Sequence, residues 1–205
     1  MEQTVCRKRA KVAGVFTIFL ALNELLSFLL YFVRVVQYSG IPAENLIRNL
    51  VMLSALTVVV IQAMRNKSGV VLFVAVTVYA AAFQWFTLTG IIRGTTKPNV
   101  YTYIMLLSLV SLIVVAAFSA FKCDRLVRYT WYLPVLITLV FALGYYAYNI
   151  EYYADLFSIG LSFEDYIYRA SAVNNLFLRP VFVLYLMLWL KSMADERLRR
   201  ETYRW

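Results

Sequence analysis

From residue 12 to residue 33 the chain reads VAGVFTIFLALNELLSFLLYFV. A helix needs about 20 predominantly apolar residues to cross the hydrocarbon core of a bilayer, and this stretch has that length. Basic residues precede it, as they precede the core of a signal peptide. However, the apolar run is too long for a signal peptide, and no small-residue cleavage site closes it. We therefore interpret residues 12–33 as a retained membrane span.

Five further apolar runs of comparable length follow the first one. They cover residues 46–64, 69–92, 99–121, 129–148 and 176–194, with Gly, Pro or clustered charge in most of the breaks between them. Of all residues, 62% are hydrophobic and 15% are charged, whereas about a quarter of the residues in a soluble domain are charged. We expect an all-α, polytopic integral membrane protein, with a single domain of six transmembrane helices over residues 1–205.

The distribution of Lys and Arg predicts the orientation of these spans. Fourteen of the 20 basic residues fall on the side that carries the N-terminus, and six fall on the other side. Short loops rich in Lys and Arg stay in the cytoplasm. We expect both termini in the cytoplasm, including a basic tail at residues 195–205, and a cell membrane (plasma or bacterial inner membrane) as the location. The net charge of +9 is accounted for by this orientation, so we expect no nucleic-acid partner.

The one long loop, residues 149–175, joins the fifth and sixth spans and is rich in acids and aromatic residues. Ser162 followed by Asp165 is a weak helix-start signal, so we predict a short interfacial helix here. The loop has two interpretations: an aromatic belt at the membrane surface, which we favour, or a cap over a ligand site. The candidate cap residues are Glu151, Asp155, Glu164, Asp165 and Tyr166.

Glu24 is the residue that most needs a physical explanation. It lies near the middle of the first span, where a charged side chain costs on the order of 2.5–3.5 kcal/mol by insertion scales. The cost falls if the carboxylate meets a partner or a water-filled cavity, or if it takes up a proton. Two alternatives remain open: a solute or ion pathway centred on Glu24, or a structural acid that ties helices together.

Residues at a similar depth in the other spans are candidates to line such a pathway with Glu24. Arg179, which precedes Pro180 at the start of the sixth span, either binds a carboxylate or extends to the outer headgroups; we favour the headgroups. The candidate path residues are Glu24, Asn23, Thr57, Gln84, Ser108, Thr138 and Arg179.

We expect a membrane transport or channel component that moves or captures a small solute or ion near Glu24. The alternative is a non-catalytic regulator, immunity or assembly partner that acts through protein contacts. The chain has no His, and no catalytic, metal-binding or cofactor motif is recognisable, so we predict no enzyme activity, metal or cofactor. A chain this short predicts a homo-oligomer, or a subunit of a larger membrane complex, embedded in the lipid bilayer.

Overall fold

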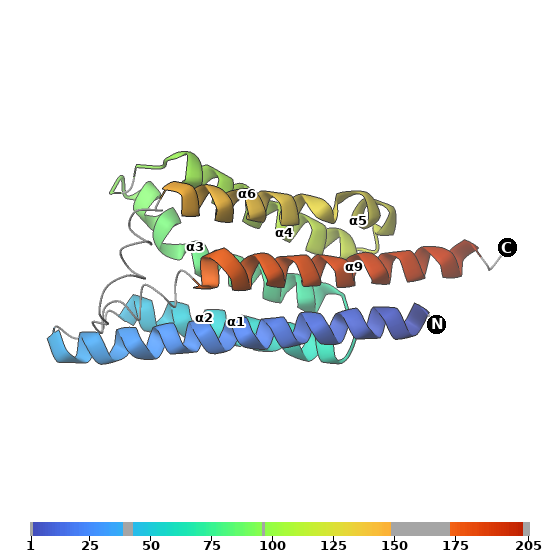
Figure 1. Ribbon diagram of the computed structural model, residues 1–205, viewed down its shortest axis with the longest axis horizontal. Helices are drawn as coiled ribbons and strands as arrows, with labels where there is room; N and C mark the ends of the chain where they lie inside the picture. Colours follow the sequence, from blue (N-terminus) through green and yellow to red (C-terminus); the bar gives the residue numbers. More distant parts are fainter. Residues whose placement is uncertain (1, 39–42, 96, 149–172, 203–205) are drawn as a thin grey trace.

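The computed structural model describes residues 2–38, 43–95, 97–148 and 173–202. Within these ranges the chain is all-helical, and the long helices run side by side along the long axis of the molecule (Figure 1). The elements are α1 (Glu2–Tyr38), α2 (Ala43–Met64), α3 (Val70–Ile92), α4 (Val100–Ala120), α5 (Asp124–Thr130), α6 (Tyr132–Tyr148), the π-helical turn η1 (Asn174–Leu178) and α9 (Arg179–Thr202).

Six segments of the described chain are long and apolar enough to cross a membrane: Thr4–Leu29, Glu44–Met64, Val70–Ile92, Val100–Ala120, Asp124–Gly144 and Asn174–Thr202. The expectation of an all-helical chain with six membrane-length apolar helices is confirmed. The fifth segment combines α5 with α6, and the sixth begins with η1, so residues 174 and 175 belong to the last span rather than to the preceding loop. The predicted interfacial helix falls within residues 149–172, which lie outside the described residues.

Local sequence explains where several of these helices begin and end. The residues Asn66, Gly94 and Lys122 follow α2, α3 and α4, and each has a positive φ, of 51°, 69° and 58°. This left-handed conformation ends a helix, and it is most easily adopted by Gly and Asn. At the start of α4, Asn99 and Thr102 form a reciprocal capping box. Each of these residues lies in a short connection between two helices. Because the connections are short, each one reverses the direction of the chain.

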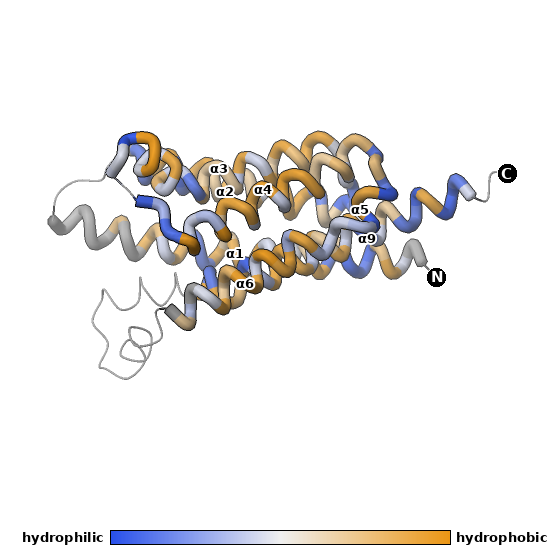
Figure 2. Tube along the Cα trace, turned by 90° about the horizontal axis from the view of Figure 1, so that it is seen from above, coloured by the Kyte–Doolittle hydropathy of each residue, from blue (hydrophilic) through white to orange (hydrophobic). Residues whose placement is uncertain are grey.

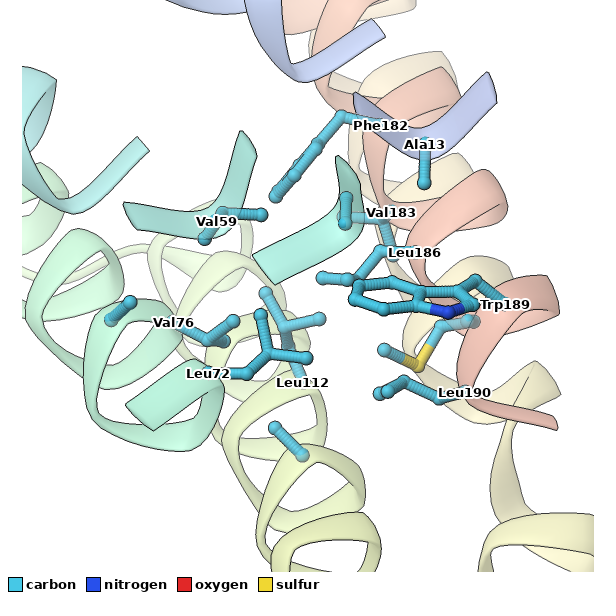
Figure 3. Close-up of a cluster of buried hydrophobic side chains, with 14 of the residues drawn as sticks. Ala13, Val59, Leu72, Val76, Leu112, Phe182, Val183, Leu186, Trp189 and Leu190 are labelled. Atoms are coloured by element: carbon cyan, nitrogen blue, oxygen red, sulfur yellow. The ribbon is translucent and has the colours of Figure 1, made fainter. Parts of the chain in front are cut away.

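The described helices pack in a closed ring in which the last helix, α9, lies between α6 and α1. Each of α1 to α4 packs against the next, α4 packs against α6, and α9 contacts both α6 and α1. The tube in Figure 2 is apolar along the middle of the bundle and polar mainly near its ends. In Figure 3 the side chains of Phe182, Leu186 and Trp189 on α9 point into the core, and each is at most 1% exposed.

Both chain ends lie at the same end of the bundle (Figure 1), which we call the terminal end, in contrast to the opposite end. At the terminal end, Asn66 Oδ1 accepts a hydrogen bond from the indole Nε1 of Trp189 at 2.9 Å and one from Cys6 Sγ at 3.6 Å. Arg197 of α9 forms an ion pair with Asp124 at 2.8 Å. These contacts connect α9 to α1, to the α2–α3 turn and to α5.

The Trp189–Asn66 contact makes a testable prediction about stability. Asn66→Gly keeps the left-handed backbone accessible but leaves the buried indole N–H without its acceptor, which costs about 1–3 kcal/mol. We expect this decrease in the free energy of unfolding, measured by reversible denaturation in detergent micelles. Lys122→Gly is the matched control, because Lys122 has a similar φ but an exposed side chain. An equal effect of the two substitutions would contradict a role for the hydrogen bond.

Candidate functional site

Glu24 of α1 and Arg179 at the start of α9 form an ion pair inside the bundle. The carboxylate Oε1 lies 2.7 Å from the guanidinium Nη2, and the two side chains are 9% and 14% exposed. Charges removed from water lose much of their solvation energy, so a buried pair is stable only when its geometry is close and other polar groups join it. The pair therefore fixes α1 to α9 at a depth where neither charge would be stable alone.

Arg179 has three further partners, which hold its planar guanidinium in one orientation. Its Nε donates a hydrogen bond to the hydroxyl of Tyr79 at 3.3 Å, and its Nη1 donates to Asn175 Oδ1. Its Cζ lies 3.4 Å from the ring centroid of Phe83, so the cation rests on the face of the ring. Contacts from α1, α3 and η1 thus converge on one side chain.

The π-helical turn η1 places this arginine and two asparagines. The backbone N–H of Arg179 donates to the carbonyl oxygen of Asn174, five residues earlier, and Pro180 has no backbone N–H to contribute. Short π-helical segments are often found at functional sites. The side chain of Asn174, 2% exposed, accepts a hydrogen bond from Asn23 Nδ2 at 2.7 Å. The turn therefore contributes a second polar contact between α1 and the last span.

Beside the ion pair lies a cavity of about 370 Å³, which we call the polar chamber. It extends from Glu24 toward the opposite end of the bundle, where α2 begins and α3 ends. The α2 residues in its lining lie near the start of that helix, and the α3 residues lie in the second half of theirs. The lining residues are Glu24, Ser27, Phe28, Asn45, Arg48, Asn49, Met52, Phe83, Phe86, Asn174, Asn175 and Arg179.

The lining of the polar chamber consists mostly of charged, amide and hydroxyl side chains, with three aromatic rings and a methionine among them. Arg48 lies with its Cζ 4.6 Å from the ring centroid of Phe86, and its Nη2 donates to Asn49 Oδ1 at 3.3 Å. The buried hydroxyl of Ser27 has no hydrogen-bond partner among the described residues. A polar molecule in the chamber would satisfy this hydroxyl. Nowhere in the described chain do three or more His, Cys, Asp or Glu side chains cluster to hold a metal ion.

On the terminal side of the ion pair the interior becomes apolar. Leu20, Leu56, Val76, Phe182 and Leu186 come from four different helices, and each is at most 1% exposed. They lie about one to two turns beyond the residues of the ion pair and the chamber, toward the terminal end. The described side chains therefore close the polar chamber on this side with a packed apolar layer.

The structure brings together only some of the residues predicted to line a path. Asn23, Glu24 and Arg179 meet at the ion pair. Thr57 is exposed, and its hydroxyl bonds to Leu53 O of its own helix at 2.9 Å. Ser108 of α4 and Thr138 of α6 form a hydrogen bond with each other at 2.6 Å. The side-chain amide of the buried Gln84 has no hydrogen-bond partner in the described part of the chain. None of these last four residues lines the polar chamber.

The expectation that Arg179 extends to the outer headgroups is wrong. The guanidinium instead turns inward to Glu24, because the ion pair, Tyr79, Asn175 and Phe83 together offer it more contacts than one headgroup would. The alternative, that Arg179 binds a carboxylate, is confirmed. The candidate cap residues Glu151, Asp155, Glu164, Asp165 and Tyr166 fall outside the described residues.

Several chamber residues were missed from the sequence, although patterns for them exist. Asn45 and Asn49 are four residues apart and lie on one face of α2, with Arg48 beside them. The dipeptide Asn174-Asn175 lies one turn before Arg179. A polar face at the start of an apolar helix resembles an ordinary helix end at the membrane surface, so these patterns did not stand out.

Comparison with known proteins gives no match to a protein family, a curated protein or a solved structure. The function is therefore argued from the geometry of the site.

The Glu24–Arg179 pair predicts strong coupling in a double-mutant cycle. Glu24→Gln or Arg179→Gln alone leaves a buried charge unpaired, which costs about 3–5 kcal/mol. We expect Glu24→Gln/Arg179→Gln to lose much less stability than the sum of the single variants, in reversible unfolding measured in detergent micelles. Thr57→Val is the control on the exposed face of α2, with an expected change within about 0.5 kcal/mol. Additive effects of the two single substitutions would show that the charges do not interact.

Proposed function

We propose that this protein is a membrane transport component that captures a small polar solute in the polar chamber. The observation that carries the proposal is a cavity of about 370 Å³, lined by charged and amide side chains, inside a bundle of membrane-length apolar helices. Polar lining in an apolar bundle is costly unless it is satisfied, and intramembrane ionisable residues are functional-site candidates for this reason. A bound polar solute would offset that cost.

Capture fits the geometry better than an open channel does. A channel needs a continuous polar path, whereas the apolar layer around Leu56 and Phe182 separates the polar chamber from the terminal end. Release on that side would require α1, α3 and α9 to separate, and these are the helices that Arg179 connects. A solute that competes for Glu24 or Arg179 would loosen this connection, which gives solute binding a route to a conformational change.

The orientation of the chamber follows from the basic residues. With the basic terminal end in the cytoplasm of a cell membrane, the polar chamber lies in the outer half of the bilayer. A chain of 205 residues is small for a transporter built from two repeat halves. We therefore propose that it acts as a homo-oligomer or with a partner subunit that supplies the driving step.

Native mass spectrometry of the protein released from lipid nanodiscs tests the capture of a solute. We expect the wild type to retain a small polar molecule, and Asn49→Leu to lose it, because leucine removes two polar groups from the chamber. Thr57→Leu is the matched control on the exposed face of the same helix and should retain the molecule. Retention by Asn49→Leu, or no retained molecule in any variant, would favour the alternative of a non-catalytic membrane partner.

Cysteine labelling tests the proposed orientation. In a Cys6→Ala/Cys123→Ala background, single cysteines are introduced at Lys97 and Lys122, which are exposed at opposite ends of the bundle. We expect a membrane-impermeant maleimide to label Lys97→Cys in intact cells, and Lys122→Cys only after permeabilisation. The reverse pattern would place the polar chamber on the cytoplasmic side.

A further inference from the structure

A second cavity lies at the terminal end of the bundle, between the first turns of α1 and the last turns of α9. Its volume is about 520 Å³, and we call it the terminal cleft. Figure 1 shows both helices extending past the turn between α2 and α3 at this end, and a residue of that turn completes the cleft. No described residue lines both this cleft and the polar chamber. The lining residues are Thr4, Arg7, Asn66, Met193, Glu196, Arg197 and Arg200.

The length of the last span places the terminal cleft at the level of the lipid head groups. This segment has 29 residues, which is about 43 Å at a rise of about 1.5 Å per residue, whereas the hydrocarbon core of a bilayer is about 30 Å thick. Some of its turns therefore lie outside the hydrocarbon. They are the turns at the terminal end, because charged residues are frequent from Lys191 onward. Molecules at the bilayer surface and in the adjacent solution can both reach the cleft.

Positive charge exceeds negative charge in the lining of the terminal cleft, which holds three arginines and one acid, Glu196. Glu196 forms an ion pair with Arg200 on the next turn of α9. Arg197 forms an ion pair with Asp124 of α5 at 2.8 Å. Arg7 is exposed, and no described residue forms an ion pair with it. One cation therefore remains in the cleft after the acids beside it are paired.

The turn between α2 and α3 contributes further positive charge and a hydrogen-bond donor. Arg65 and Lys67 flank Asn66 in this turn, and both are exposed. Asn66 Oδ1 already accepts hydrogen bonds from Trp189 Nε1 and Cys6 Sγ. The Nδ2 group of Asn66 is therefore the one left for a ligand, and an amide nitrogen can only donate.

Arg197 also has a donor that the described residues leave unused. Its Nη atoms lie 3.5 Å from oxygen atoms of Ser119, and one of them lies 2.8 Å from Asp124. Its Nε is buried and has no hydrogen-bond partner in the described chain. An oxyanion in the cleft would give this donor a partner after a small rotation of the side chain. Guanidinium groups suit this role, because they bind oxyanions through parallel N–H bonds.

We propose that the terminal cleft binds a phosphate group between Arg7 of α1 and Arg197 of α9. A phosphate has more acceptor oxygens than a carboxylate has, so it can accept hydrogen bonds from both helices and from Asn66 at once. The phosphate belongs either to the head group of an anionic phospholipid or to a soluble phosphate ester, since both reach this level. The site goes beyond the proposed function, because the packed apolar layer separates it from the polar chamber.

Isothermal titration calorimetry tests the site, with inorganic phosphate added to the full-length protein in phosphatidylcholine nanodiscs. We expect saturable binding to the wild type, and a loss of affinity of about tenfold or more in Arg7→Gln and Arg197→Gln, because each removes a charged donor. Arg7→Gln is the more informative variant, since Arg197→Gln also breaks an ion pair. Arg125→Gln is the matched control: Arg125 is exposed at the same end but lines a different cavity, so the affinity should be unchanged.

Native mass spectrometry distinguishes the two sources of the phosphate. The protein is released from nanodiscs of phosphatidylcholine with phosphatidic acid added. Retention of phosphatidic acid by the wild type and Arg125→Gln, but not by Arg7→Gln, would identify a lipid head group. Binding of inorganic phosphate that is undiminished in these nanodiscs would identify a soluble phosphate ester. Either result supports the site.

Two results would overturn the proposal. The first is a wild type that neither binds inorganic phosphate saturably nor retains phosphatidic acid. The second is an effect of Arg7→Gln no larger than that of Arg125→Gln, because phosphate would then respond only to the overall charge of the terminal end. Both results leave solute capture in the polar chamber untouched, since Asn49→Leu tests that separately.

Discussion

A carboxylate inside a lipid bilayer must be paired or protonated, and the arrangement of this bundle follows from how Glu24 is paired. Its partner, Arg179, comes from the other end of the sequence, so the ion pair closes the ring of helices between α1 and α9. The π-helical turn before Pro180 places the arginine, and Tyr79, Phe83 and Asn175 hold it in position. Glu24, Arg179 and Asn175 also form part of the wall of the polar chamber.

Buried ion pairs add little net stability compared with well-packed apolar residues, and they are costly when one partner is lost. Such a pair in a membrane bundle is therefore more readily explained by a function than by stability. Here it forms one wall of the polar chamber, whose lining also includes Arg48 and four asparagine side chains.

The six helices could be predicted from the sequence, because an apolar run of bilayer length has few alternatives to a membrane helix. Glu24 was also identified as the residue that needed an explanation. Carboxylate binding by Arg179 was only the less favoured alternative, because counting residues from the span ends placed Arg179 near the surface, and a π-helical turn leaves no clear pattern in the sequence. Thr57 was predicted to line the pathway only because it lies at a similar depth in its span to Glu24. Its hydroxyl instead donates a hydrogen bond to the backbone of its own helix, as threonine side chains commonly do.

The central claim is that Glu24 is ionised and paired with Arg179 within the bundle. Infrared difference spectroscopy of the wild type against Glu24→Gln, in lipid at neutral pH, tests this claim most directly. Our account predicts that the substitution removes an ionised carboxylate band and leaves the protonated carboxyl region unchanged. Loss of a protonated carboxyl band instead would show that Glu24 is neutral, and it would contradict the ion pair on which the site depends.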